Sequence, residues 1–192
     1  PAIQKLGQHA TIRLALAPTG LFAGAGGRVM YAAFADFAWS NDVRIEKLTG
    51  QRFTEDYCTK ILGQPGSRFD SATSTLALTA VALTVPQHEL DALKMLQEAR
   101  YIHALDTTAV PVVEKLLRDI GLDAAADRLA AGDTELLAAN AARIQKAQGL
   151  MQTFGAQGVP ALVVTDENGS RLLRGNALYG SFDVLLSHIA AA

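Results

Sequence analysis

The first residues of the chain show two hydrophobic patterns in succession. Ile3 and Leu6 lie three positions apart, as they would on one face of a helix. Thr11–Ala17 then alternates, with an apolar side chain at every second position, which is the period of a β-strand. The pattern predicts a short helix followed by a strand over Thr11–Ala17.

From Arg28 to Phe154 the apolar positions recur at helical spacing, and the residues between the runs are typical helix caps and stops. The pattern predicts an all-helical segment made of many helices. These are a helix through Val29, Phe34 and Phe37, a further helix capped by Asn41 or Asp42 and ended by Gly50, a short helix begun by Thr54, the helices Thr75–Val85, Pro86–Ala104, Val110–Ile120 and Asp123–Ala131, and a long helix capped by Asp133.

The period changes again near the end of the chain. Val159–Val164 is a short apolar run of the kind found in buried strands. Glu167-Asn168-Gly169 follows it, and Asn-Gly is a strong signal for a tight hairpin turn. The sequence therefore predicts an antiparallel hairpin that returns along Arg171–Arg174, and then a terminal helix to Ile189 that starts at Ser181 or Asp183.

The order of the predicted elements defines the domain organisation. Strands occur at both ends of the chain, and they can form a single α/β core only if they share one sheet. Residues 1–27 and 155–192 are therefore expected to form that core. Residues 28–154 are expected to form a helical insertion subdomain together with the helix that returns to the core.

Composition and charge exclude several classes of protein. Apolar residues make up 49% of the chain and charged residues 19%, which is typical of a folded globular protein. The net charge of −2 gives no basic face, so no nucleic-acid partner is expected. The apolar run from Leu76 to Val85 stops at Pro86, well short of the ~20 residues of a spanning helix. No membrane partner is expected either.

Cysteine and histidine usage limits the possible chemistry. Cys58 is the one cysteine of the sequence, so these residues can form neither an internal disulfide nor a CxxC motif. Its neighbours Glu55 and Asp56 disfavour a thiolate, although Lys60 is near, and we interpret Cys58 as a structural thiol. The four histidines show no metal-ligand spacing, so no metal site is expected. A lone thiol suits a reducing compartment.

The segment Gly158-Val159-Pro160 at the head of a strand, followed by a hairpin and a closing helix, resembles the C-terminal half of a thioredoxin fold. The long helical insertion before it resembles the DsbA-like branch of that fold. The stretches Leu48–Phe53, Glu98–Ile102 and Leu116–Asp123 are similar to the FrnE-like group of DsbA-family proteins. The resemblance implies an α/β, thioredoxin-like fold with a large all-helical insertion.

The resemblance also implies a substrate-binding loop at Val159 and Pro160. In such folds the peptide bond before this proline is cis, which X-Pro bonds tolerate far better than others do. Proline has no N–H, and the main chain of the preceding residue is left free to pair with an extended substrate. We therefore expect Val159 and Pro160 to bind substrate.

The sequence departs from the family at the redox centre. In the family a strand leads into a CxxC motif, and a proline follows some residues later, about where Pro1 stands here. We therefore expect that strand and its thiol pair to precede residue 1. The residues shown then contain no catalytic residue, no cofactor site is implied, and the 192-residue chain by itself should be inactive.

Three functions agree with these features. The first is a DsbA-family thiol–disulfide oxidoreductase or isomerase that acts on protein or small-thiol disulfides, with glutathione as a possible partner. The second is an enzyme similar to kappa-type glutathione transferases or 2-hydroxychromene-2-carboxylate isomerases, which carry a serine-type motif in place of CxxC. The third is a non-catalytic thioredoxin-fold binding module. The resemblance and the lone cysteine favour the first function and a cytoplasmic location.

Overall fold

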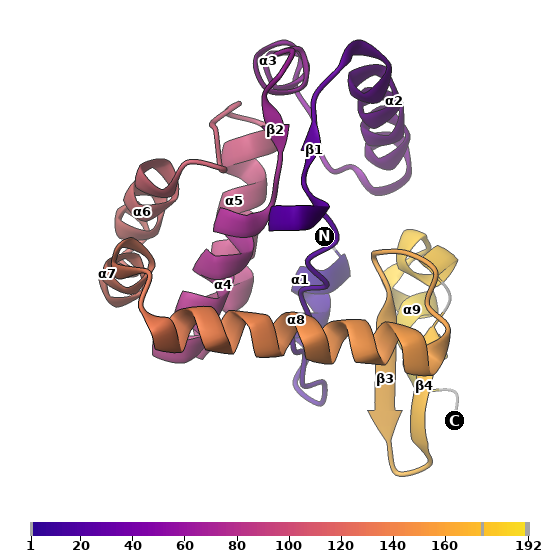
Figure 1. Cartoon of the computed structure of the whole chain (residues 1–192). Coiled ribbons are helices and arrows are strands. Elements are labelled where there is room, and N and C mark those ends of the chain that lie inside the picture. Colours follow the sequence, from indigo (N-terminus) through magenta and orange to yellow (C-terminus); the bar gives the residue numbers. More distant parts are fainter. Residues whose placement is uncertain (1, 174, 191–192) are drawn as a thin grey trace. The chain divides into compact units, whose positions relative to one another are not determined.

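The computed structural model describes residues 2–173 and 175–190 (Figure 1). Pro1, Arg174 at the end of the predicted return strand, and the last two residues lie outside the described part. The chain forms two compact units: unit 1 is Pro1–Ala15 with Gln145–Ala192, and unit 2 is Leu16–Ile144. These boundaries differ from the predicted ones, which assigned residues 1–27 and 155–192 to the core and residues 28–154 to the helical insertion. The predicted domain assignment remains a prediction.

Helices dominate unit 2, and most begin and end where the sequence predicts. Thr54 accepts a hydrogen bond from the Tyr57 N–H (3.2 Å), and Asp133 accepts one from the Leu136 N–H (2.8 Å), so both act as the predicted N-caps. The helices are α2 (Ala32–Thr49), α3 (Glu55–Tyr57), α4 (Ala72–Thr84), α5 (Glu89–Tyr101), α6 (Val110–Asp119), α7 (Asp123–Ala131) and the first part of α8 (Thr134–Phe154), with 3-10 turns at Gly24–Gly26 and Pro86–His88 and a π-helical turn at Cys58–Leu62.

The main hydrophobic core of unit 2 lies among α4, α5, α6 and α7. It is built almost entirely from alanine, valine and leucine, and many of these side chains have no exposed surface. Small side chains let the helices approach closely, which gives the packing density of a protein interior. The buried members are Ala77, Leu78, Ala80, Val81, Ala92, Leu96, Val113, Leu117, Leu122, Ala125, Ala126, Leu129 and Leu136.

The region before this core differs from the predicted one in two ways. α2 is one continuous helix, so the further helix capped by Asn41 or Asp42 was a wrong prediction. Asp42 lies inside α2, and its side chain accepts a hydrogen bond from the Tyr57 hydroxyl (3.1 Å). Gly50 does end the helix, as predicted. Its φ of 72° lies in the left-handed region that glycine adopts readily.

Val29 lies in a strand, whereas its spacing to Phe34 predicted a helix. β1 (Arg28–Val29) pairs antiparallel with β2 (Arg68–Phe69), with Arg28 opposite Phe69 and Val29 opposite Arg68. A two-residue strand is too short to show the alternation that distinguishes strands from helices in a sequence. The pairing therefore comes from contacts distant in the chain.

Residues 11–17 form no strand, so the predicted mixed sheet that would join them to the C-terminal hairpin is not observed. Their side chains nevertheless alternate in burial: Ile12, Leu14 and Leu16 are half-buried, and the residues between them are exposed. The hydrophobic period therefore predicted correctly which of these side chains are half-buried and which are exposed. A strand also needs a hydrogen-bonded neighbour, and within the described residues this segment pairs with none.

Unit 1 contains the hairpin predicted near the end of the chain. β3 (Leu162–Asp166) pairs antiparallel with β4 (Gly169–Leu173), and their register joins Leu162 to Leu173 and Asp166 to Gly169. Glu167 and Asn168 form the turn, and Gly169 after it has a φ of 118°, which glycine adopts readily. The other elements of the unit are α1 (Ala2–Gly7), the end of α8, a 3-10 turn (Gly175–Tyr179) and α9 (Phe182–Ala190), whose first turn is capped by Ser181.

Candidate functional site

The predicted substrate-binding residues lie in the loop that joins α8 to β3 in unit 1. Residue 155 leaves α8 in the left-handed region, and the Ala156 N–H closes the helix end by donating to the Met151 carbonyl (2.9 Å). β3 begins at Leu162, where the ladder with β4 fixes the chain. The loop is therefore held at both ends, and its tip is residues 158–160.

The tip of this loop presents main chain as well as side chain. Val159 is 51% exposed, and Gly158 and Pro160 beside it are exposed too. Within the described residues, neither the N–H nor the C=O of Val159 has a hydrogen-bond partner. Exposed main-chain groups of this kind are available to an extended ligand.

The peptide bond between Val159 and Pro160 is cis, which confirms the prediction made from the resemblance. The structure therefore places both predicted residues together at the loop tip. Their role in binding substrate remains a prediction.

The hairpin that follows the loop is fixed by an ion pair. Arg171 on β4 binds the Asp166 carboxylate at the end of β3, and its guanidinium also donates to the Ile189 carbonyl of α9 (2.6 Å). Hydrogen bonds from Arg171, and then from the Asn168 N–H, hold the pKa of Asp166 below its usual value. The ion pair thus connects both strands and α9 within unit 1.

Cys58 is placed as a structural thiol would be. It lies in the π-helical turn of unit 2, half-buried, and its pKa is raised, first by burial and then by the carboxylates Asp36, Asp42 and Glu55. The one cation near it in sequence, Lys60, is paired with Asp56 (2.8 Å). These surroundings disfavour the thiolate that disulfide exchange requires.

A second group of titratable side chains, which the sequence does not reveal, lies beside Cys58. The half-buried Asp42 carboxylate accepts the Tyr57 hydroxyl, and burial raises the pKa of Asp42 from 3.8 to about 6. The Arg100 guanidinium lies 5.8 Å from the centre of the Tyr57 ring and 5.2 Å from that of Phe69. No spacing rule connects these residues, because they come from α2, α3, α5 and β2.

Three further polar or aromatic side chains, His103, Tyr101 and Trp39, lie in ordinary positions. His103 is exposed, while Tyr101 and Trp39 pack against the aromatic cluster around Phe34 and Tyr57. Within the described residues, no three His, Cys, Asp or Glu side chains lie close enough to hold a metal ion. None of the helices in the described ranges is both long enough and apolar enough to cross a membrane.

Solved structures of other proteins share this arrangement. A cytosolic disulfide reductase, DsbM, from Pseudomonas aeruginosa superimposes with a TM-score of 0.80 at 23% sequence identity, over 100% of this chain and 91% of that one. A structure of the same reductase with GSH gives 0.78 at 23% identity, over 99% and 89% of the two chains. A candidate protein disulfide isomerase from Nitrosomonas europaea gives 0.77 at 19% identity, over 100% and 89%.

The chain has a DsbA-like thioredoxin fold. This confirms the fold class predicted from the C-terminal segment and the helical insertion. No protein-family model matches the sequence, and no curated protein does. The DsbA-like fold therefore rests on structural similarity.

Proposed function

We propose that this protein is a thiol–disulfide oxidoreductase that acts on protein or small-thiol disulfides and uses the Val159–Pro160 loop to hold its substrate. The observation that carries the proposal is the exposed main chain of Val159 at the tip of a loop fixed at both ends. The DsbA-like fold supports it, because the solved neighbours are described as a disulfide reductase and a candidate disulfide isomerase.

The proposed chemistry assigns binding, rather than electron transfer, to the residues described here. A thiolate attacks one sulfur of the substrate disulfide, a mixed disulfide forms, and a second thiol resolves it. The Val159 N–H and C=O would pair with the substrate main chain beside the reacting sulfur. Cys58 is the one cysteine of the sequence, so we propose that both redox-active thiols precede residue 1.

We also propose glutathione as the small-thiol partner and the cytoplasm as the location. One of the neighbouring structures is described as holding GSH, and the reductase itself is described as cytosolic. Two glutathione thiols would return two electrons to the enzyme disulfide and leave as glutathione disulfide. A reducing compartment supplies that thiol.

The proposal is tested by measuring glutathione-dependent reduction of a fluorescent disulfide reporter. The 192-residue chain is compared with a chain that also carries the sequence its gene encodes before Pro1. We expect many turnovers from the longer chain. We expect no more than one thiol equivalent of reaction from the shorter one, and none of that reaction in its Cys58→Ser variant.

Two results would contradict the proposal. Multiple turnover by the 192-residue chain that disappears with Cys58→Ser would make Cys58 the nucleophile. A longer chain without a thiol pair and without turnover would favour the alternatives. In that case, a serine-type motif together with conjugation or isomerisation of a glutathione-dependent substrate would indicate the kappa-type class. Binding without any reaction would indicate a non-catalytic module.

A further inference from the structure

The outer edge of β1 in unit 2 carries main-chain groups without a partner. The Met30 N–H donates to the Ser67 carbonyl (2.8 Å), so alternate residues of this strand direct their main-chain groups toward β2. Val29 lies between two such residues, and its N–H and C=O therefore point away from β2. Within the described residues neither group has a hydrogen-bond partner, and Val29 is 54% exposed. An open strand edge of this kind is a template for another extended chain.

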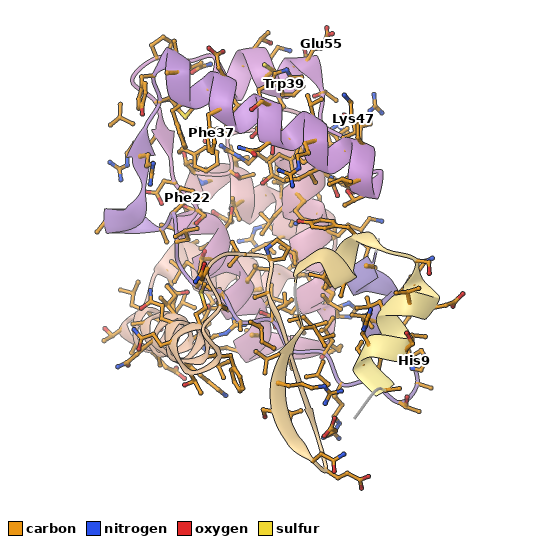
Figure 2. The ribbon with its side chains drawn as sticks, turned by 90° about the vertical axis from the view of Figure 1, so that its right-hand side faces the viewer. His9, Phe22, Phe37, Trp39, Lys47 and Glu55 are labelled. Atoms are coloured by element: carbon orange, nitrogen blue, oxygen red, sulfur yellow. The ribbon has the colours of Figure 1, made fainter. Side chains whose placement is uncertain are left out.

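Apolar side chains flank this edge on one face of the ribbon. Tyr31 follows in an extended conformation, so its side chain lies on the same face as that of Val29, opposite to the buried Met30. Tyr31 is 60% exposed and Phe37 on α2 is 62% exposed. Both rings contact the buried ring of Phe34, with centroids 6.1 and 6.5 Å away. Figure 2 shows Phe37 on α2 and Phe22 on the segment before β1.

The opposite face of the ribbon carries a cation held in place by two rings. The Arg28 guanidinium lies 5.8 Å from the centre of the Phe22 ring and 5.6 Å from that of Phe34. Arg28 is exposed, and in the described part of the chain no carboxylate lies within ion-pair distance of it. A guanidinium that is positioned but unpaired is complementary to a carboxylate.

We propose that the β1-edge surface, formed by Arg28, Val29, Tyr31 and Phe37, docks an extended segment of a protein substrate in which apolar and acidic side chains alternate. A strand paired with β1 would present successive side chains to the two faces of the ribbon in turn. One face offers Val29 and Tyr31 to apolar side chains, and the other offers Arg28 to an acidic one. The identity of the occupant as a substrate rests on the proposed function.

The test measures binding of a fluorescein-labelled, cysteine-free peptide of alternating valine and glutamate, by fluorescence anisotropy. Val29→Pro removes the outward N–H and leaves the ladder bonds to β2, because proline is tolerated at such an edge position. We expect it to weaken binding about tenfold, and the matched Val29→Ala variant, which keeps the N–H, to weaken it less than about threefold. Arg28→Gln should abolish the preference for this peptide over its valine–lysine counterpart.

The amide resonance of Val29 in the unaltered chain provides a measurement that does not depend on any variant. It should shift on addition of the glutamate peptide. No binding, or equal binding by Val29→Pro, would overturn the docking site. The proposal would also be overturned if the chain bound no peptide but formed a dimer that Val29→Pro converts to monomer. The occupant of the edge would then be a second copy of the chain. Reporter turnover without peptide binding overturns the docking site alone, whereas binding without turnover supports it and contradicts the proposed activity.

Discussion

The two hydrophobic clusters of unit 2 are built from different residues and leave different surfaces. The α4–α7 cluster consists of alanine, valine and leucine side chains that are all buried, and we call it the closed cluster. The cluster around α2 is rich in aromatic rings, which pack with Met30 and Leu62, and of the eighteen residues of α2 Phe34 is the buried one. The side chains of the first cluster are almost entirely buried, whereas Tyr31 and Phe37, whose rings pack against the second cluster at Phe34, are 60% and 62% exposed. We infer that the first cluster provides stability and the second provides surface for binding.

The largest expected effect is on the closed cluster. Leu117→Ala removes a side chain with no exposed surface and leaves a cavity between α6 and its neighbours, so it should lower the free energy of unfolding by about 2–5 kcal/mol. Urea denaturation followed by far-UV circular dichroism measures this. Leu48→Ala on α2, where the side chain is 47% exposed, is the matched control and should cost less than about 1 kcal/mol. Equal losses of unfolding free energy in Leu117→Ala and Leu48→Ala would contradict the proposed difference between the two clusters.

A smaller effect is expected from the carboxylate inside the aromatic cluster. Burial raises the pKa of Asp42 from 3.8 to about 6, so the folded chain binds this proton more tightly than the unfolded chain. The free energy of unfolding should therefore fall as the pH rises through that interval, by about 1–2 kcal/mol once solvent screening of the partly exposed carboxyl is included.

Asp42→Asn keeps an acceptor for the Tyr57 hydroxyl and removes the charge. The variant should lose this pH dependence and should be more stable than the unaltered chain above pH 6. Denaturation series between pH 4 and 7 measure the difference, and Asp36→Asn on the exposed side of α2 is the control. A variant with the same pH dependence as the unaltered chain would show that folding leaves the pKa of Asp42 unchanged.

The features that the sequence predicts well depend on residues close together in the chain. The helices of unit 2 follow from periodicity and from local caps such as Thr54 and Asp133. The hairpin follows from Asn168-Gly169, and the Val159–Pro160 loop follows from the family resemblance. Each of these signals lies within a few residues along the chain, so sequence patterns reveal it.

Features that depend on distant residues could not be predicted in this way. Residues 11–17 alternate as a strand does, yet strand pairing needs a neighbour that periodicity cannot supply. β1 and β2 are forty positions apart and two residues long. The Asp42–Tyr57 hydrogen bond, likewise, joins side chains of separate helices. The sequence does not predict the unpaired strand edge at Val29 either, because that edge is defined by the distant pairing of β1 with β2.

The smallest effects on stability are expected at two side chains outside the cluster cores, the exposed Phe37 and the half-buried Cys58. Phe37→Ser and Cys58→Ser should each change the free energy of unfolding by less than about 1 kcal/mol, because neither side chain is fully buried. Phe37→Ser should nevertheless weaken binding of the valine–glutamate peptide, while Cys58→Ser should leave it unchanged. Thermal denaturation and anisotropy on the same samples separate the two effects. A large loss of stability in Phe37→Ser would mean that the ring supports the core.

The most direct measurement of the proposed activity is the amide resonance of Val159 during titration with oxidised glutathione. If the loop holds the substrate main chain, the Val159 resonance should shift progressively and its hydrogen exchange should slow, because the free N–H gains an acceptor. The resonances of Val164, whose N–H is directed toward β4 within the hairpin, and of Val29 should change little. Saturation of other resonances with Val159 unchanged would contradict substrate binding at this loop.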